Sequence, residues 1–160
     1  MIISAIILGC TPTHFPEKME ISNPWHFRYD STGRGMEEEW FAADTDFRSW
    51  PTVPSGNLWR TDYDGSGWFT QEIWLPELIS DRDLALVITS VADNATVWMN
   101  DSLLAIHKGR GELFFMDITD VFKPRAMNRI TIFVEDTGGP GGLTGKVYLQ
   151  KYIEESELIR

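Results

Sequence analysis

Short runs of alternating apolar and polar side chains, separated by turn-forming residues, constrain the fold of this chain more than any other feature. In the run "RITIFVED", alternate residues Ile130, Ile132 and Val134 share one face of an extended strand. Turn pairs such as Asp93-Asn94, which tolerate the backbone of tight hairpins, separate similar runs. We expect strands within 25–30, 67–76, 113–119, 129–136 and 143–152, and three more short strands between 83 and 109. About seven or eight short strands with almost no helix predict an all-β fold, an antiparallel β-sandwich.

A long, charged connection, residues 31–56, follows the first of these strands. It is too irregular for a long helix, and it is too aromatic to be disordered. We expect its aromatic side chains to pin it to the domain; they are Trp40, Phe41, Phe47 and Trp50.

The size and charge of the chain limit its classes of function. A chain of 160 residues is expected to form one domain, with a core that needs no metal or disulfide cross-link. The formal net charge of −10 argues against nucleic acid or an anionic membrane surface as partner, because both attract a positive surface. A transmembrane helix needs about 20 apolar residues, and the longest apolar run has only about ten.

The first residues, "MIISAIILGC", resemble a bacterial lipoprotein signal, in which Cys10 becomes the lipidated first residue of the mature chain. No Lys or Arg precedes the apolar run, so an ordinary first strand is the alternative. As the single cysteine, Cys10 excludes an internal disulfide and a cysteine-based zinc site. We expect residues 1–20 to be an export leader and tether, residues 21–153 the β-sandwich domain and residues 154–160 a charged tail. The expected location is the cell envelope, the periplasm or the cell surface, with a lipid anchor as the only membrane attachment.

The glycine-rich stretch Glu135–Gly145, "EDTGGPGGLTG", does not match a phosphate-binding loop. A dinucleotide-type G-x-G-x-x-G ending at Gly142 and Gly145 needs a glycine where Pro140 stands. A P-loop needs the same glycine, and also Ser or Thr in place of Val147. Because predicted strands flank the stretch, we interpret it as a close-approach loop at one end of the sandwich.

Four phrases, in this order, resemble the amino-terminal sugar-binding domain of glycoside hydrolase family 2 enzymes. They are "WHFRYDSTGRGMEEEWFAADTDFRSWPTVPSGNLW", "DYDGSGWFTQEIWLP", "VADNATVWMNDSLLAIHKGRGELFFMDIT" and "MNRITIFVED". The resemblance covers roughly Trp25 to Leu149 and implies a galactose-binding domain-like jelly roll; Asp101 and Ala126 stand where the family usually has glycine. A similar jelly roll, with a loop like Asp136–Gly142, is also inserted in sialate O-acetylesterases. The resemblance therefore indicates a module better than it indicates a host enzyme.

No catalytic machinery is recognisable in the sequence. A retaining glycosidase needs two carboxylates about 5 Å apart, and the resemblance implies that these lie on a barrel of about 250 residues, too large for this chain. No G-x-S-x-G motif is present, and no two of the 3 histidines have metal-ligand spacing. We therefore expect no catalysis by the chain on its own and no cofactor, apart from a structural calcium ion at backbone carbonyls and Asp62 or Asp64.

Carbohydrate binding is the remaining class of function, because sugar sites combine an aromatic platform with charged or amide groups. The leading candidate is Asp136, an acidic residue at a strand end, next to backbone that glycine allows to approach a partner. It suits either a sugar or docking against a catalytic barrel. The other candidates are Glu135 beside it, His107, Arg110 and Glu112 in "HKGRGE", and Trp59, Asp64 and Trp68 around another turn.

Several candidates have an equally simple structural explanation. The alternatives are a turn for Asp64, core packing for Trp68 and for the neighbouring Trp74, loop orientation for His107, and an exposed ion pair between Arg110 and Glu112.

The main hypothesis is a non-catalytic carbohydrate-binding module, accessory to glycoside hydrolysis, with an oligosaccharide or a glycoside as ligand. The alternative is the amino-terminal fragment of a family 2 β-glycosidase of the β-galactosidase type, whose catalytic barrel is the partner and is not part of this chain. A third hypothesis is a protein-docking domain without affinity for sugar.

Overall fold

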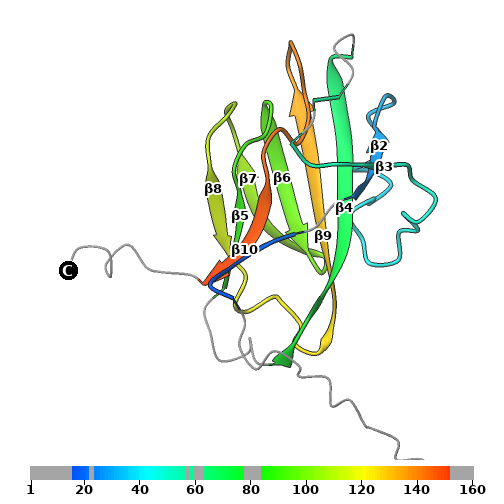
Figure 1. Ribbon diagram of the computed structural model, residues 1–160. Helices are drawn as coiled ribbons and strands as arrows, with labels where there is room; N and C mark the ends of the chain where they lie inside the picture. Colours follow the sequence, from blue (N-terminus) through cyan, green and yellow to red (C-terminus); the bar gives the residue numbers. More distant parts are fainter. Residues whose placement is uncertain (1–15, 22–23, 57, 60–62, 78–83, 152–160) are drawn as a thin grey trace, which may run out of the picture.

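The computed structural model describes residues 16–21, 24–56, 58–59, 63–77 and 84–151. These residues form two antiparallel sheets, with no α-helix among them (Figure 1). One sheet has four strands in the order β1-β10-β5-β8, and the other has six in the order β3-β2-β4-β9-β6-β7. The strands are β1 (Lys18–Glu20), β2 (Trp25–Tyr29), β3 (Thr52–Val53), β4 (Gly65–Leu75), β5 (Leu84–Ile88), β6 (Asn94–Met99), β7 (Ser102–His107), β8 (Phe114–Asp117), β9 (Ala126–Asp136) and β10 (Val147–Lys151). The predicted all-β sandwich of the jelly-roll type is confirmed.

The central strands bring three loops to one end of the six-stranded sheet. β4 and β9 pair along their full length, so that Gly65 at the start of β4 lies opposite Asp136 at the end of β9. On the other side of β9, the start of β6 at Asn94 lies opposite Glu135. The segments that precede β4 and β6 therefore meet the glycine-rich stretch that follows β9.

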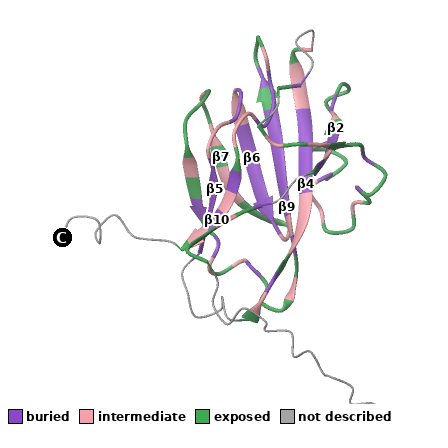
Figure 2. Ribbon diagram, viewed as in Figure 1, coloured by how far each residue is buried: buried purple, intermediate pink, exposed green. Residues whose placement is uncertain are grey.

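The core between the sheets follows the alternation seen in the sequence. Ile130, Ile132 and Val134 of β9 are fully buried, and they belong to the same apolar cluster as Leu86 of β5 and Leu149 of β10. Figure 2 shows buried residues concentrated along β4, β9 and β6.

A second apolar cluster lies on the outer face of the six-stranded sheet. Trp68 of β4 packs against Phe133 of β9 and Trp98 of β6, with ring centroids 4.6 Å and 5.6 Å apart. The connection between β2 and β3 covers these rings, which confirms the predicted role of its aromatic residues. The covering side chains are Trp40, Phe41, Phe47 and Trp50.

Asp30, at the end of β2, anchors the start of this cover. Its buried carboxylate accepts hydrogen bonds from the indole Nε1 of Trp68 at 3.1 Å and from the backbone N–H groups of Arg34 and Gly35 at 2.9 and 3.0 Å. These charge-assisted hydrogen bonds tie the first turn of the connection to Trp68 of the sheet.

The structure differs from the expectation in a few places. β1 pairs with β10, so the sandwich already includes Lys18–Glu20, and the short strand β3 was not predicted. Trp74 does not pack in a core but is 57% exposed. Cys10 and the tail 154–160 lie outside the described residues. Within the described part of the chain, no helix is long and apolar enough to cross a bilayer.

Candidate functional site

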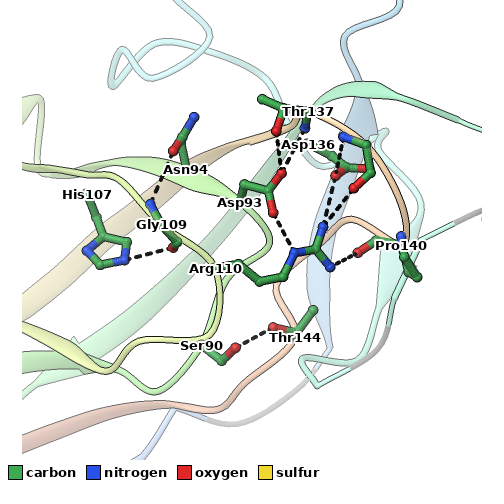
Figure 3. A network of polar contacts seen from close by, with 11 residues as sticks. Ser90, Asp93, Asn94, His107, Gly109, Arg110, Asp136, Thr137, Pro140 and Thr144 are labelled. Carbon is green, nitrogen blue, oxygen red and sulfur yellow. Dashed lines mark hydrogen bonds and ion pairs between the residues drawn. The ribbon is translucent and has the colours of Figure 1, made fainter.

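Arg110, in the loop between β7 and β8, joins the segments that meet at the loop end of the sandwich (Figure 3). Its Nε donates to the carboxylate of Asp93 at 2.6 Å, and its Nη1 donates to the carbonyl of Pro140 at 3.2 Å. Its Nη2 donates to the carbonyl of Gly138 at 3.0 Å and to Oδ1 of Asp136 at 3.4 Å. These contacts use four of the five N–H donors of a guanidinium. Arg110 therefore holds the glycine-rich stretch in one conformation.

Asp93, in the turn before β6, is tied to the other side of the same stretch. Its Oδ2 accepts hydrogen bonds from the hydroxyl of Thr137 at 2.6 Å and from the backbone N–H of Thr137 at 3.0 Å. The hydrogen bond from the Thr137 hydroxyl first, and then those from the Thr137 backbone and Arg110, hold the pKa of the Asp93 carboxyl below its ordinary value. Asp93 is thus an anionic link between the turn and the stretch at neutral pH.

Asp136 lies beneath the glycine-rich stretch, with a side chain that has no exposed surface. Its Oδ1 accepts from the backbone N–H of Gly138 at 3.1 Å and from Arg110. Its Oδ2 is buried and has no hydrogen-bond partner among the described residues. Buried carboxylate oxygens are normally hydrogen-bonded, and leaving one unpaired costs about 1–3 kcal/mol or more. Oδ2 of Asp136 is therefore a buried acceptor whose hydrogen-bonding capacity is unused among the described residues.

The glycine-rich stretch packs closely against Trp59 of the same domain. A Cβ atom at Gly141 would lie 2.2–2.3 Å from the indole atoms of Trp59. The backbone N–H of Trp59 also donates to the carbonyl of Gly141 at 2.9 Å. The stretch thus lies flat against Trp59 on one side and against Arg110 on the other.

His107 orients the loop that carries Arg110. Its ring stacks on Phe114 with centroids 4.0 Å apart, and its Nε2 donates to the carbonyl of Gly109 at 3.1 Å. The backbone N–H of Gly109 in turn donates to the side chain of Asn94 at 3.3 Å. Of the two interpretations open for His107, the structure shows the one in which it positions a loop.

The remaining predicted residues take no part in the polar contacts of this site, although Trp59 packs against the glycine-rich stretch. Trp68 is fully buried in the outer cluster and Trp59 is 8% exposed, so neither indole is an exposed platform at the loop cluster on which a sugar could stack. Trp68 and Trp59 as stacking platforms are therefore corrected to packing residues. Arg110 pairs with Asp93 and Asp136, not with Glu112, which corrects the expected ion pair. Glu112, Asp64 and Glu135 are exposed.

Two residues of the site were not predicted as such. Asp93 was assigned only to a hairpin turn, and Thr137 was not singled out. Both lie far from Arg110 in sequence. No local sequence pattern indicates that the carboxylate of an aspartate in a turn will pair with an arginine from a different loop.

The described residues contain no group of three or more His, Cys, Asp or Glu that could hold a metal ion. Asp62, one of the expected calcium ligands, lies outside the described residues. The calcium site stays a prediction.

Fold and site together define a jelly-roll β-sandwich with a polar, glycine-rich loop cluster at one end.

No protein-family model matches the chain. A β-glucuronidase of Paenibacillus borealis is 32% identical over 126 residues, which are 75% of this chain and 21% of that enzyme. The chain is therefore similar in sequence to about a fifth of that relative.

Solved structures show the same likeness in fold. The β-glucuronidase of Ruminococcus gnavus superposes with a TM-score of 0.75 and 17% identity, over 86% of this chain and 30% of that one. The β-glucuronidase of Bacteroides uniformis superposes with a TM-score of 0.73 and 19% identity, over 82% of this chain and 17% of that one. A glycosyl hydrolase family 2 member from Bacteroides cellulosilyticus superposes with a TM-score of 0.74 and 19% identity, over 84% of this chain and 20% of that one. The resemblance to the jelly-roll domain of family 2 enzymes is confirmed, whereas the likeness to the module of sialate O-acetylesterases stays a prediction.

Proposed function

We propose that this chain is a non-catalytic carbohydrate-binding module, accessory to glycoside hydrolysis, and that it binds sugar at the loop cluster around Asp136. The observation that carries the proposal is the buried Oδ2 of Asp136, which lies beneath a glycine-rich stretch and has no hydrogen-bond partner among the described residues. Sugars offer rings of hydroxyl donors, and a carboxylate accepts strong hydrogen bonds from them. The likeness to parts of β-glucuronidases supports the same class of ligand.

Arg110 offers a ligand one charged hydrogen-bond donor. Its side chain is 44% exposed, and its contacts with described residues leave one N–H donor of the guanidinium for a ligand. A guanidinium is well suited to a carboxylate. The relatives are named β-glucuronidases, so we propose β-glucuronides as the ligand class to test first.

Calorimetric titration of the purified chain with methyl β-glucuronide, methyl β-glucoside and methyl β-galactoside tests this function. We expect millimolar binding, tightest for the glucuronide. Asp136→Asn should weaken binding at least tenfold, because the charged acceptor is lost. The matched control is Glu135→Gln, which alters the adjacent, exposed carboxylate and should change affinity less than twofold.

Two results contradict the proposal. If a folded Asp136→Asn variant binds as tightly as the parent, Asp136 is not in the site. If none of the three glycosides binds at about 20 mM, carbohydrate binding by this chain is wrong and the docking hypothesis is favoured. Circular dichroism and thermal melting establish that each variant is folded.

The second candidate function is the amino-terminal part of a longer family 2 β-glycosidase. The observation that favours it is the length of the relatives, of which this chain spans 17–30%. In that arrangement the cluster around Asp136 completes a site on a catalytic barrel. An open reading frame after Arg160, corrected for one frameshift, that encodes a barrel with paired glutamates would support it; an unrelated frame would exclude it.

We also propose export with lipidation at Cys10, which rests on the sequence alone. Palmitate labelling of cells that express the chain should be lost in a Cys10→Ser variant. Labelling that persists in the variant would refute the anchor.

A further inference from the structure

A cavity walled by aromatic rings lies between the inner face of β2 and the segment that follows β3. Its volume is about 240 Å³, and the rings that line it belong to Phe27 and Tyr29 of β2, Phe69 of β4 and Trp59. Val53 of β3 and the 52% exposed Leu58 complete the wall. The proposed sugar site does not use this space.

The aromatic wall is built by rings that fix one another. Phe27 packs against Phe69 and against Tyr29, each with centroids 4.7 Å apart. Trp59 lies nearly parallel to Phe69, with an interplanar angle of 8° and a centroid distance of 6.4 Å. Rings held by such mutual contacts keep their orientation, so the cavity is formed before a ligand arrives.

The chemistry of the lining selects the ligand. None of the lining residues that the structure describes carries a charge, so these residues offer an ionised group no partner in exchange for its lost hydration. Ring faces and edges offer stacked and edge-to-face contacts that a flat aromatic guest satisfies better than an aliphatic one. An apolar cavity of about 150 Å³ accepts benzene, so the present volume accommodates one or two fused rings.

We propose that this cavity binds an uncharged aromatic group of one or two rings, which enters past Leu58. The proposal goes beyond the sugar-binding function and does not depend on it. Among the described residues, Trp59 is common to both sites, because it lines the cavity and contacts Gly141 of the glycine-rich stretch.

Titration with indole and 2-naphthol, followed in ¹H–¹⁵N NMR spectra, tests the proposal. Both probes should shift the indole N–H signal of Trp59, which is assigned by its absence in a Trp59→Phe variant. Cyclohexylmethanol, an aliphatic probe of similar size, should bind at least fivefold more weakly.

A filling substitution tests the location. Val53→Phe places a ring inside the cavity and should weaken indole binding at least tenfold. Leu113→Phe, which enlarges an exposed side chain in the loop before β8, is the matched control and should change affinity less than twofold. If Val53→Phe does not fold, Leu58→Trp at the half-exposed entrance replaces it and should have the same effect.

Several outcomes overturn the proposal: no binding of either probe at about 5 mM, equal affinity for cyclohexylmethanol, or undiminished binding in a folded blocking variant. Asp136→Asn should leave indole binding unchanged. A chain that binds indole but no glycoside disproves the proposed function alone, and the reverse result disproves this inference alone.

Discussion

Asp93 illustrates how a single side chain sets the pH range over which the site is ordered. Its hydrogen bonds from Thr137 and Arg110 lower the pKa of the Asp93 carboxyl in the folded protein relative to the unfolded chain. A lowered folded pKa means that the stabilisation is fully present above the unfolded pKa and is lost as pH falls through the folded pKa. The glycine-rich stretch should therefore stay tied to the turn at neutral pH and loosen only in acid.

The Thr137→Val variant tests this interpretation. It removes the side-chain donor but keeps the backbone N–H, so the pKa of Asp93 should rise part of the way toward its ordinary value. The measurement is a ¹³C NMR titration of the side-chain carboxyls. Thr45→Val removes a hydroxyl that donates to a backbone carbonyl away from the site and should leave the midpoint of Asp93 unchanged. Identical Asp93 midpoints in the parent and in Thr137→Val would show that the hydroxyl does not set the pKa.

At the scale of elements, the glycine-rich stretch after β9 packs over one end of the sandwich. The sequence indicated a loop whose glycines permit close approach, and the structure shows that the approach is to Trp59 and Arg110 of the same chain. The stretch also pairs with the turn before β6, where the backbone groups of Ala92 and Gly142 exchange hydrogen bonds at 3.1 and 3.2 Å. Any partner that reaches Asp136 must therefore meet or displace this stretch.

Gly141→Ala should destabilise the domain by about 1–3 kcal/mol, because the new methyl group would overlap the indole of Trp59. Urea denaturation measures the change. The free energy of unfolding should fall much less when the same substitution is made in a Trp59→Phe background, since the overlapping atoms are then absent. An equal loss in both backgrounds would mean that contact with Trp59 is not the reason for glycine.

At the scale of the whole molecule, the described residues form two apolar clusters, one between the sheets and one outside the six-stranded sheet. The outer cluster exists because the connection between β2 and β3 lies over Trp68, Trp98 and Phe133. It extends the buried surface beyond a two-layer sandwich, and this burial contributes to stability in proportion to the apolar area removed from water.

Alanine substitutions at two tryptophans test how much the outer cluster contributes to the free energy of unfolding. Trp40→Ala should lower the free energy of unfolding by about 3 kcal/mol, because Trp40 is only 8% exposed and packs on Trp50 and Trp68. Trp74→Ala, at a residue that is 57% exposed, should change it by no more than about 0.5 kcal/mol. Urea unfolding of both variants gives the comparison. Similar values for the two would show that the connection contributes little to stability.

The sequence by itself determined the class of fold and most of its strands. Alternation specifies which side chains share a face, and turn residues specify where a strand ends, so both signals are local. The buried face of β9 and the hairpin from β6 to β7 were predictable for this reason. The same local phrases carried the resemblance to family 2 enzymes.

Only the tertiary structure decided which faces are covered and which charges meet. Trp68 and Trp74 lie on the same face of β4 with the same local pattern, yet one is fully buried and the other exposed, because the connection covers only part of that face. Likewise, Asp136 was recognisable as a strand-end acid, but its burial under Arg110 depends on loops far apart in sequence, and so does the lack of a partner for its Oδ2 within the described part of the chain. Periodicity assigns a side chain to a face, whereas long-range packing determines what lies against that face.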